Sequence, residues 1–290
     1  MEYNSLFQSI YKRCSVRKYQ SEPLAHGLLK QVEELTHSMP RLDSSISMKV
    51  HLIENGAKLH NISRGIIGSY GKFNAPHYFI VSSEEKPWYM ENVGFSLEYL
   101  VLKLTTLNLG TCWIGGFVKK SLLNDIIEMP ENHVPIIVIA FGYPLNPDKL
   151  TNRNLRLNLL DEIEAIPDKY SDPTEKLVAA TKRKEIDEIV CGDLDEVWLS
   201  IMDAVRHAPS AINSQPWRFH KINNEIHIYG IKRTKVAQTL EYINKIDLGI
   251  ALCHLVAAAQ LKGKKLELKA MENMDKKGLN YFISVIEHKN

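Results

Sequence analysis

Four stretches of the chain carry apolar residues at the spacing of an amphipathic helix. This spacing predicts helices at about residues 24–39, 92–110, 194–208 and 246–263. Pro40 follows the first stretch as a stop, and the second ends near Gly110. Because its apolar stripe runs for about five turns, the second stretch is expected to be a core helix.

Shorter runs of β-branched and aromatic residues, ended by turn-forming residues, indicate strands. They predict strands at residues 76–84, 133–144, 217–224, 225–231 and 280–288. Helix and strand signals alternate along the chain, and the second half repeats the outline of the first.

A polar segment at about residues 146–185 separates the two patterns. It contains three prolines and only short apolar groupings, as a connector does. The helical stretches on either side share an amide or acidic residue, then x-Gly, then an apolar stripe, as Asn92-Val93-Gly94 and Asp247-Leu248-Gly249. We therefore predict an internal duplication, with halves at residues 1–165 and 166–290 that form one integrated unit.

Charge and composition narrow the classes of function. Lys plus Arg (36) nearly balances Asp plus Glu (34) over 290 residues, so a polyanionic partner such as nucleic acid is not expected. Residues 1–20 lack the apolar core of a signal peptide, and no later stretch is judged long enough to span a membrane. We expect a cytoplasmic protein without a membrane partner.

The cysteines and histidines predict no metal site. Four cysteines lie far apart without a C-x-x-C pair, so they are expected to be reduced. His77 and His254 are interpreted as packing or surface residues. The sequence also lacks a dinucleotide-binding glycine motif, a phosphate loop, H-E-x-x-H and G-x-S-x-G.

Three segments could carry chemistry, and each has a purely structural alternative. "YKRCSVRKY" at 11–19 could hold an anion, or it could be a solvated basic turn; on a helix Arg13 and Arg17 would share a face and Ser15 could cap. "NSQPW" at 213–217 could read the edge of a planar heterocycle, or it could be an ordinary turn. "GTCWIGGF" at 110–117 could let backbone N–H groups approach a ligand, or it could mark a close crossing of elements.

Together these segments resemble the FMN-dependent nitroreductase family. "RCSVRKY" is similar to the family's Arg-x-Ser-x-Arg/Lys element, "APSAINSQPW" to its Asn-Ser-Gln-Pro-Trp loop, and "LGTCWIGGF" to its flavin-edge loop. The order departs from the ordinary family, because here the amide loop comes late. The arrangement resembles a branch in which two nitroreductase-like halves are fused, and it covers nearly the whole chain. The resemblance implies an α+β fold, with a mostly antiparallel sheet flanked by helices, in a single-chain pseudo-dimer that can be active as a monomer.

The resemblance also implies a set of FMN-binding residues. Arg13 and Ser15 match positions at the phosphate or ribityl chain, and Arg17 matches the cation near the N1/O2 edge of the flavin. The backbone at Gly115 and Gly116 matches the approach to N5 and O4, with Trp113 beside it. Arg183 resembles a late basic residue that completes phosphate binding, and Ser210, Asn213 and Gln215 match loop positions at the ring or ribityl chain. The full cofactor-binding set is Arg13, Cys14, Ser15, Arg17, Trp113, Ile114, Gly115, Gly116, Arg183, Pro209, Ser210, Asn213 and Gln215.

The implied activity is a ping-pong oxidoreduction in which NAD(P)H reduces bound FMN and a nitroaromatic, quinone or similar small-molecule acceptor takes the electrons. No catalytic acid or base is expected, because the flavin carries the chemistry. The alternatives are a flavin-binding or sensing protein without turnover and a scaffold with a degenerate site. The complementary motifs of the two halves predict one FMN per chain.

Overall fold

The computed structural model describes residues 2–59, 74–115, 120–146, 182–232 and 238–288. The chain divides into two compact units. Unit 1 comprises Met1–Tyr11, Met90–Glu98 and Lys182–Asn290, and unit 2 comprises Lys12–Tyr89 and Tyr99–Thr181. The predicted halves describe a duplication rather than compact units, and they remain a prediction; their boundary at 165/166, most of the predicted connector and Gly116 lie outside the described residues.

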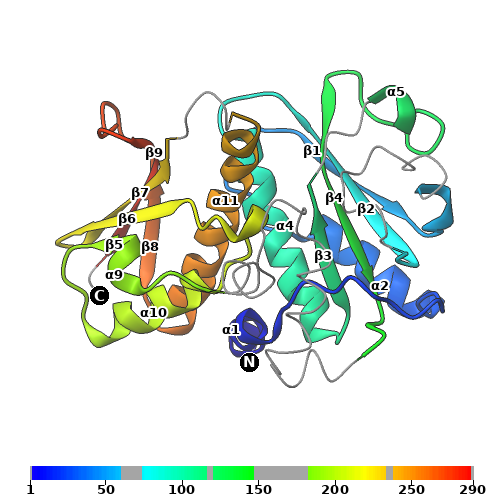
Figure 1. Cartoon of the computed structure of the whole chain (residues 1–290), viewed down its shortest axis with the longest axis horizontal. Coiled ribbons are helices and arrows are strands. Elements are labelled where there is room, and N and C mark those ends of the chain that lie inside the picture. Colours follow the sequence, from blue (N-terminus) through cyan, green and yellow to red (C-terminus); the bar gives the residue numbers. More distant parts are fainter. Residues whose placement is uncertain (1, 60–73, 116–119, 147–181, 233–237, 289–290) are drawn as a thin grey trace, which may run out of the picture. The chain divides into compact units, whose positions relative to one another are not determined.

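Unit 2 contains an antiparallel sheet in the order β1-β2-β4-β3 (Figure 1). The predicted strands at 76–84 and 133–144 are confirmed as the two central ones. Every residue of β2 except its last is buried, because the apolar run is covered on both faces. The elements of this unit are α2 (His26–His37), β1 (Met48–Ile53), β2 (His77–Glu84), β3 (Gly110–Ile114), α5 (Lys120–Leu123) and β4 (His133–Gly142).

Unit 1 contains a second sheet in the order β5-β6-β7-β9-β8, in which only the β5–β6 pair is parallel. The strands predicted at 217–224 and 225–231 are observed as β6 and β7, which pair as a hairpin; Asn223 at its turn has φ 53°, which asparagine tolerates. The elements are α1 (Glu2–Lys12), α9 (Ile186–Ile189), β5 (Val190–Cys191), α10 (Glu196–Arg206), the 3₁₀ turn η1 (Ala211–Asn213), β6 (Trp217–Ile222), β7 (Glu225–Ile231), α11 (Gln238–Leu261), β8 (Lys265–Lys269) and β9 (Leu279–His288). The described architecture is α+β, as predicted.

The two glycine-containing helices cross within unit 1 at their glycines. Helix α4 (Tyr89–Thr106) places Gly94 against the backbone carbonyl of Ile246, and α11 places Gly249 against the backbone carbonyl of Glu91. Each glycine thus meets the residue three positions before the other glycine. A Cβ at either position would overlap a backbone oxygen, so the shared x-Gly pattern is needed for a close, reciprocal approach.

The end of α4 differs from the sequence prediction. The helix ends at Thr106, and Asn108, with φ 57°, takes the left-handed position that was assigned to Gly110. The Asn108 and Leu109 N–H groups bond to the carbonyls of Thr105 and Leu104, which is a Schellman motif. Gly110 instead begins β3, where a Cβ would lie 2.8–2.9 Å from side-chain atoms of Val16. At Gly110 the close-crossing alternative is therefore correct.

The expectation that no stretch is long enough to span a membrane is wrong for helix α11. Its residues Leu240–Leu261 are long and apolar enough to cross a membrane, contrary to the sequence-based expectation, but 78% of the most apolar window is buried inside the protein. Its burial is that of a core helix. His254 on this helix is fully buried, and its ring contacts the Ala204 carbonyl and the Glu98 carboxyl group, so it is a packing residue as predicted.

Candidate functional site

The N-terminal arginine segment follows α1 and is extended. Ser15 forms a parallel bridge with Thr111 of β3, and the Val16 N–H donates to the Thr111 carbonyl at 2.8 Å. The helical arrangement considered for Arg13 and Arg17 is therefore wrong, because backbone pairing with β3 holds this segment straight. The bridge brings two of the sequence-predicted segments side by side.

Side-chain alternation divides the arginine segment into two faces. Cys14 and Val16 pack on the hydrophobic core of unit 2, together with Cys112 and Ile114 of β3. In extended chains alternate residues point to opposite sides, so Arg13, Ser15 and Arg17 lie on the other face. Trp113 lies by the same rule opposite the core. The side chains of Cys14 and Ile114 pack on this core.

Arg17 is the most distinctive residue of this region. Its Nε and Nη1 atoms are buried and have no hydrogen-bond partner among the residues that the structure describes. A buried guanidinium donor normally has a partner, since leaving one unmade is costly. Nearby Tyr19 is buried, which raises the pKa of its hydroxyl well above the ordinary value, while the Arg17 charge opposes that shift. Arg17 has the character of a residue that binds an anion or a carbonyl-rich ligand edge.

The amide loop, residues 208–215, lies in unit 1 between α10 and β6. Ile212, Asn213 and Gln215 adopt positive φ angles of 49°, 54° and 44°. Asparagine tolerates this conformation, but a β-branched isoleucine rarely adopts it. Ile212 is also 69% exposed. The loop therefore holds a strained backbone that its surroundings must maintain.

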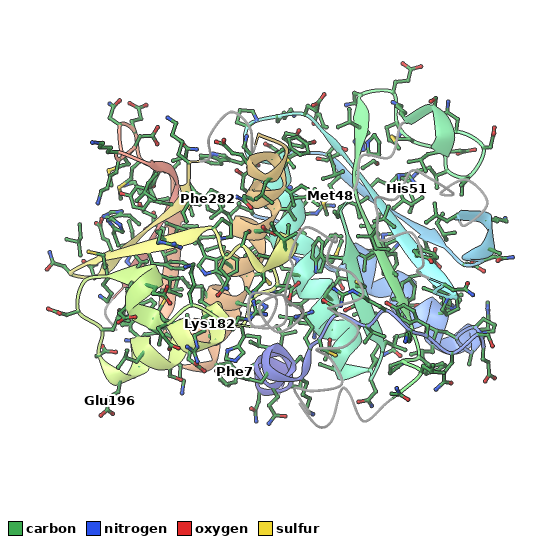
Figure 2. All side chains as sticks on the ribbon, viewed as in Figure 1. Phe7, Met48, His51, Lys182, Glu196 and Phe282 are labelled. Carbon is green, nitrogen blue, oxygen red and sulfur yellow. The ribbon has the colours of Figure 1, made fainter. Side chains whose placement is uncertain are left out.

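Residues 182–184, which we call the strap, run beside this loop. Arg183 Nη1 donates to the Ala208 carbonyl and to Asn213 Oδ1, both at 2.9 Å, and Nη2 donates to the His207 carbonyl at 3.4 Å. Figure 2 labels Lys182, where the strap begins; its carbonyl accepts from the Asn213 side-chain amide at 3.0 Å. The predicted Arg183 thus lies with the predicted loop residues.

Gln215 completes this network from inside the loop. Its side chain is 2% exposed; Oε1 accepts from the Lys184 N–H at 2.8 Å, and Nε2 donates to the Lys182 carbonyl at 3.1 Å. Ser210 Oγ accepts from the Gln215 N–H at 3.0 Å, and Pro209 is half-buried beside it. Sequence reasoning placed these residues together but did not foresee that their polar groups contact one another.

Two residues of α11 also hold the loop and were missed. The buried Asp247 carboxylate accepts from the Ala211 N–H at 3.2 and 3.3 Å, and Ser214 Oγ donates to Asn244 Oδ1 at 3.2 Å. Asp247 had been noticed only as part of the duplicated x-Gly pattern. Its burial at 3% exposure could not be deduced from that pattern.

A chain of histidines and serines, buried except at Ser47, crosses the unit 2 sheet and was not predicted. His51, labelled in Figure 2, lies 3.0 Å from Ser82 Oγ, which lies 3.1 Å from His133 Nδ1; His133 Nε2 in turn lies 2.9 Å from Ser47 Oγ. Burial lowers the pKa of His51 to about 4, with Lys49 and His133 adding to the shift. No group of three or more His, Cys, Asp or Glu residues suited to a metal occurs in the described ranges.

The pKa of Glu91, at the start of α4 in unit 1, is shifted upward, whereas that of His51 is shifted downward. Burial raises the pKa of its carboxyl group to about 7, against smaller opposing contributions from its own backbone N–H and from Lys245. It lies at the crossing with Gly249. Both shifts arise mainly from desolvation, which disfavours the charged form of either group.

Comparison with known proteins assigns the chain to a family. A family model described as "Putative TM nitroreductase" matches residues 5–259. A curated "Putative NADH dehydrogenase/NAD(P)H nitroreductase" of Methanothermobacter thermautotrophicus is 25% identical over 48% of this chain and 77% of its own length. A protein of the same description from Archaeoglobus fulgidus is 20% identical over 51% of this chain and 91% of its own length.

A solved structure, described as a putative nitroreductase from Thermotoga maritima, is similar over almost the whole chain. It has a TM-score of 0.58 at 19% identity and covers 97% of this chain and 93% of its own. At 19% identity this structural similarity supports the fold alone. Family membership rests on the family model, which matches residues 5–259. The chain belongs to the nitroreductase family of oxidoreductases.

Proposed function

We propose that the protein is an FMN-dependent NAD(P)H oxidoreductase that reduces nitroaromatics, quinones or similar small molecules by a ping-pong reaction. When bound, FMN would supply the redox chemistry, since it accepts a hydride from NAD(P)H and passes two electrons to the acceptor. The protein's own residues would bind the flavin, orient it and set its electrostatic environment. Neither nucleic acid nor a membrane is part of this proposal, and we propose a cytoplasmic location.

The buried donors of Arg17 are the observation that carries the proposal. They have no partner among the described residues, and they belong to the residue that the resemblance assigns to the N1/O2 edge. A guanidinium there would stabilise the negative charge that collects on the reduced ring. The donor chemistry of this site therefore fits a flavin.

Other residues of unit 2 would complete the binding surface beside Arg17. The buried Arg13 and the half-buried Ser15 lie on the same face of the arginine segment and would contact the ribityl chain or phosphate. Gly115 directly follows β3, so its backbone N–H would approach the flavin edge without a side chain in the way. Ser210, Asn213 and Gln215 would hold the shape of the amide loop, which the resemblance assigns to the ring or ribityl chain.

We further propose that the chain imitates a dimer of half-length relatives and holds one FMN. The curated relatives match 48% and 51% of this chain while 77% and 91% of their own length is covered. The reciprocal crossing at Gly94 and Gly249 also resembles a pseudo-two-fold contact, in which each element meets the equivalent of itself. The first half carries the arginine segment and the second half the amide loop, so together they supply one complete ligand set.

A reductive titration tests the activity. We expect a yellow protein whose flavin absorbance bleaches with NAD(P)H under anaerobic conditions and returns on addition of a nitroaromatic or a quinone. Colour without bleaching would support the flavin binder without turnover, and a protein that stays colourless after FMN addition would support the degenerate scaffold.

The flavin-to-chain ratio tests the pseudo-dimer. We expect a ratio near one in protein saturated with FMN and separated from excess cofactor. A ratio near two would contradict the complementarity of the halves, and so would a site that forms only when two chains associate.

A further inference from the structure

Within the proposed FMN site, we propose that Arg183 is a positioning residue that fixes the amide loop, and that it is not a ligand of the flavin phosphate. This inference rests on the proposed function for its ligand, but the structural contacts on which it stands lie wholly within unit 1. It departs from the role that the family resemblance implies for this arginine.

The first argument is the use of the guanidinium donors. Both hydrogens of Nη1 are directed at protein acceptors 2.9 Å away, the Ala208 carbonyl and Asn213 Oδ1. Nη2 reaches the His207 carbonyl. An end-on bidentate grip on a phosphate uses Nη1 and Nη2 together, and Nη1 would have to release the loop to provide one of these donors.

The second argument is the conformation that Arg183 holds. Left-handed backbone at a residue other than glycine is strained and persists only where the surroundings enforce it. Ile212, Asn213 and Gln215 all have this conformation. Arg183 holds the loop at its first residue, Ala208, and again at Asn213, in the middle of the strained stretch.

The third argument is that the strap acts as a unit. Gln215 is bonded to the backbone of Lys182 and Lys184, on either side of Arg183. Arg206 Nη1 donates to the carbonyl of Lys184, in the strap, at 3.5 Å and to Glu185 Oε2 at 2.9 Å. Arg183 therefore sits at the centre of a bonded network whose other members also hold the loop.

Binding of FMN and of riboflavin distinguishes a positioning role from a phosphate contact, because riboflavin lacks the phosphate. We expect Arg183→Gln to raise the Kd for FMN and the Kd for riboflavin by a similar factor of at least ten. The ratio of the two Kd values should stay within threefold of the wild-type ratio. Arg183→Lys should behave like Arg183→Gln, since lysine cannot reproduce the planar fork. Lys265→Gln, which removes an exposed charge on β8, is the matched control and should change neither Kd.

Loss of FMN affinity with unchanged riboflavin affinity would overturn the proposal, as would full retention of FMN by Arg183→Lys. Unchanged binding of both ligands by Arg183→Gln would overturn it as well. Hydrogen exchange of the flavin-free protein supplies a second readout: amides of residues 211–215 should exchange at least tenfold faster in Arg183→Gln, and equal exchange would contradict the positioning role. If wild-type protein binds neither flavin, the proposed function fails, while the exchange measurement still decides the role of Arg183.

Discussion

Arg17 and Arg183 were both assigned to the flavin by resemblance, yet their surroundings differ in kind. Arg17 has two buried donors without partners in the described chain, whereas Arg183 directs its donors at carbonyl and amide oxygens of the amide loop. An arginine that already donates to protein must break bonds to bind a ligand, and one with unused buried donors gains by binding. Two arginines that a resemblance assigns to the same ligand can therefore have different physical roles.

The difference follows from how each segment is held in place. The arginine segment is aligned by backbone bonds, including that from Val16 to Thr111, so its alternate side chains remain available. The amide loop is irregular and depends on the side chains of Arg183, Asn213 and Gln215 for its shape. Substitutions in the first segment should act mainly on ligand binding, and substitutions in the second mainly on stability.

The largest effect is expected for Gln215→Ala. The change removes the side chain of Gln215, a residue that is 2% exposed. The Lys184 N–H then loses its bond to Gln215 Oε1, and the Lys182 carbonyl loses its bond from Gln215 Nε2. We expect the free energy of unfolding to fall by about 3 kcal/mol, measured by urea denaturation of the flavin-free protein. Gln260→Ala, at an exposed position of α11, should cost less than about 0.5 kcal/mol. Similar costs at the two positions would remove the contrast between the regions.

Arg17→Ala should give the opposite outcome. Loss of charge-assisted donors to the flavin should weaken FMN binding by roughly thirtyfold, about 2 kcal/mol, and should make reduction of the bound flavin harder because the cation favours the reduced ring. Stability without flavin should be unchanged, since the buried donors lose no partner in the described residues. Lys18→Ala provides the exposed control. An unchanged reduction potential and Kd in Arg17→Ala would remove Arg17 from the site.

His51 in unit 2 and Glu91 in unit 1 should respond to acid with opposite signs. The pKa of His51 is about 4 in the folded protein against an ordinary value of 6.5, so its contribution to stability is lost as pH falls from 6.5 toward 4. Glu91 has a folded pKa of about 7 against an ordinary 4.5, so its contribution is full below pH 4.5 and is lost as pH rises toward 7.

These pKa shifts correspond to at most about 3 kcal/mol of stability across each window. Hydrogen exchange as a function of pH can report the two units separately. His51→Gln should reduce the loss of exchange protection in unit 2 between pH 6.5 and 4. Glu91→Gln should reduce the change in exchange protection of unit 1 between pH 4.5 and 7. If neither variant changes the pH response of its own unit relative to the wild-type protein, these assignments are wrong.

The smallest effect is expected for Gly110→Ala. The added methyl group would meet Val16 and press the arginine segment away from β3, at a cost of about 1 kcal/mol. In the double variant with Val16→Gly, the loss of stability should be smaller than the sum of the two single losses, because Val16→Gly makes room for the methyl group. Strict additivity would show that this contact does not fix the segment.

The core helices and the main strands could be predicted from the sequence, because each depends on local pattern. Helices α2, α4, α10 and α11 follow their apolar spacing, and β2, β4, β7 and β9 follow their β-branched runs. The end of α4 was placed wrongly since Asn108 can adopt the left-handed conformation that Gly110 was expected to supply. The helical alternative at Arg13–Arg17 failed because pairing with β3 is a long-range contact.

For this protein the sequence determined which residue types lie in which element, and through its motifs the family to which the chain belongs. Tertiary structure alone decided which polar groups contact one another: that Arg183 and Gln215 hold the amide loop, that Asp247 supports it, and that two donors of Arg17 remain without protein partners in the described chain. The physical reason is that hydrogen bonds and burial depend on the distance between residues far apart in sequence. Helical spacing and strand alternation depend only on neighbours along the chain.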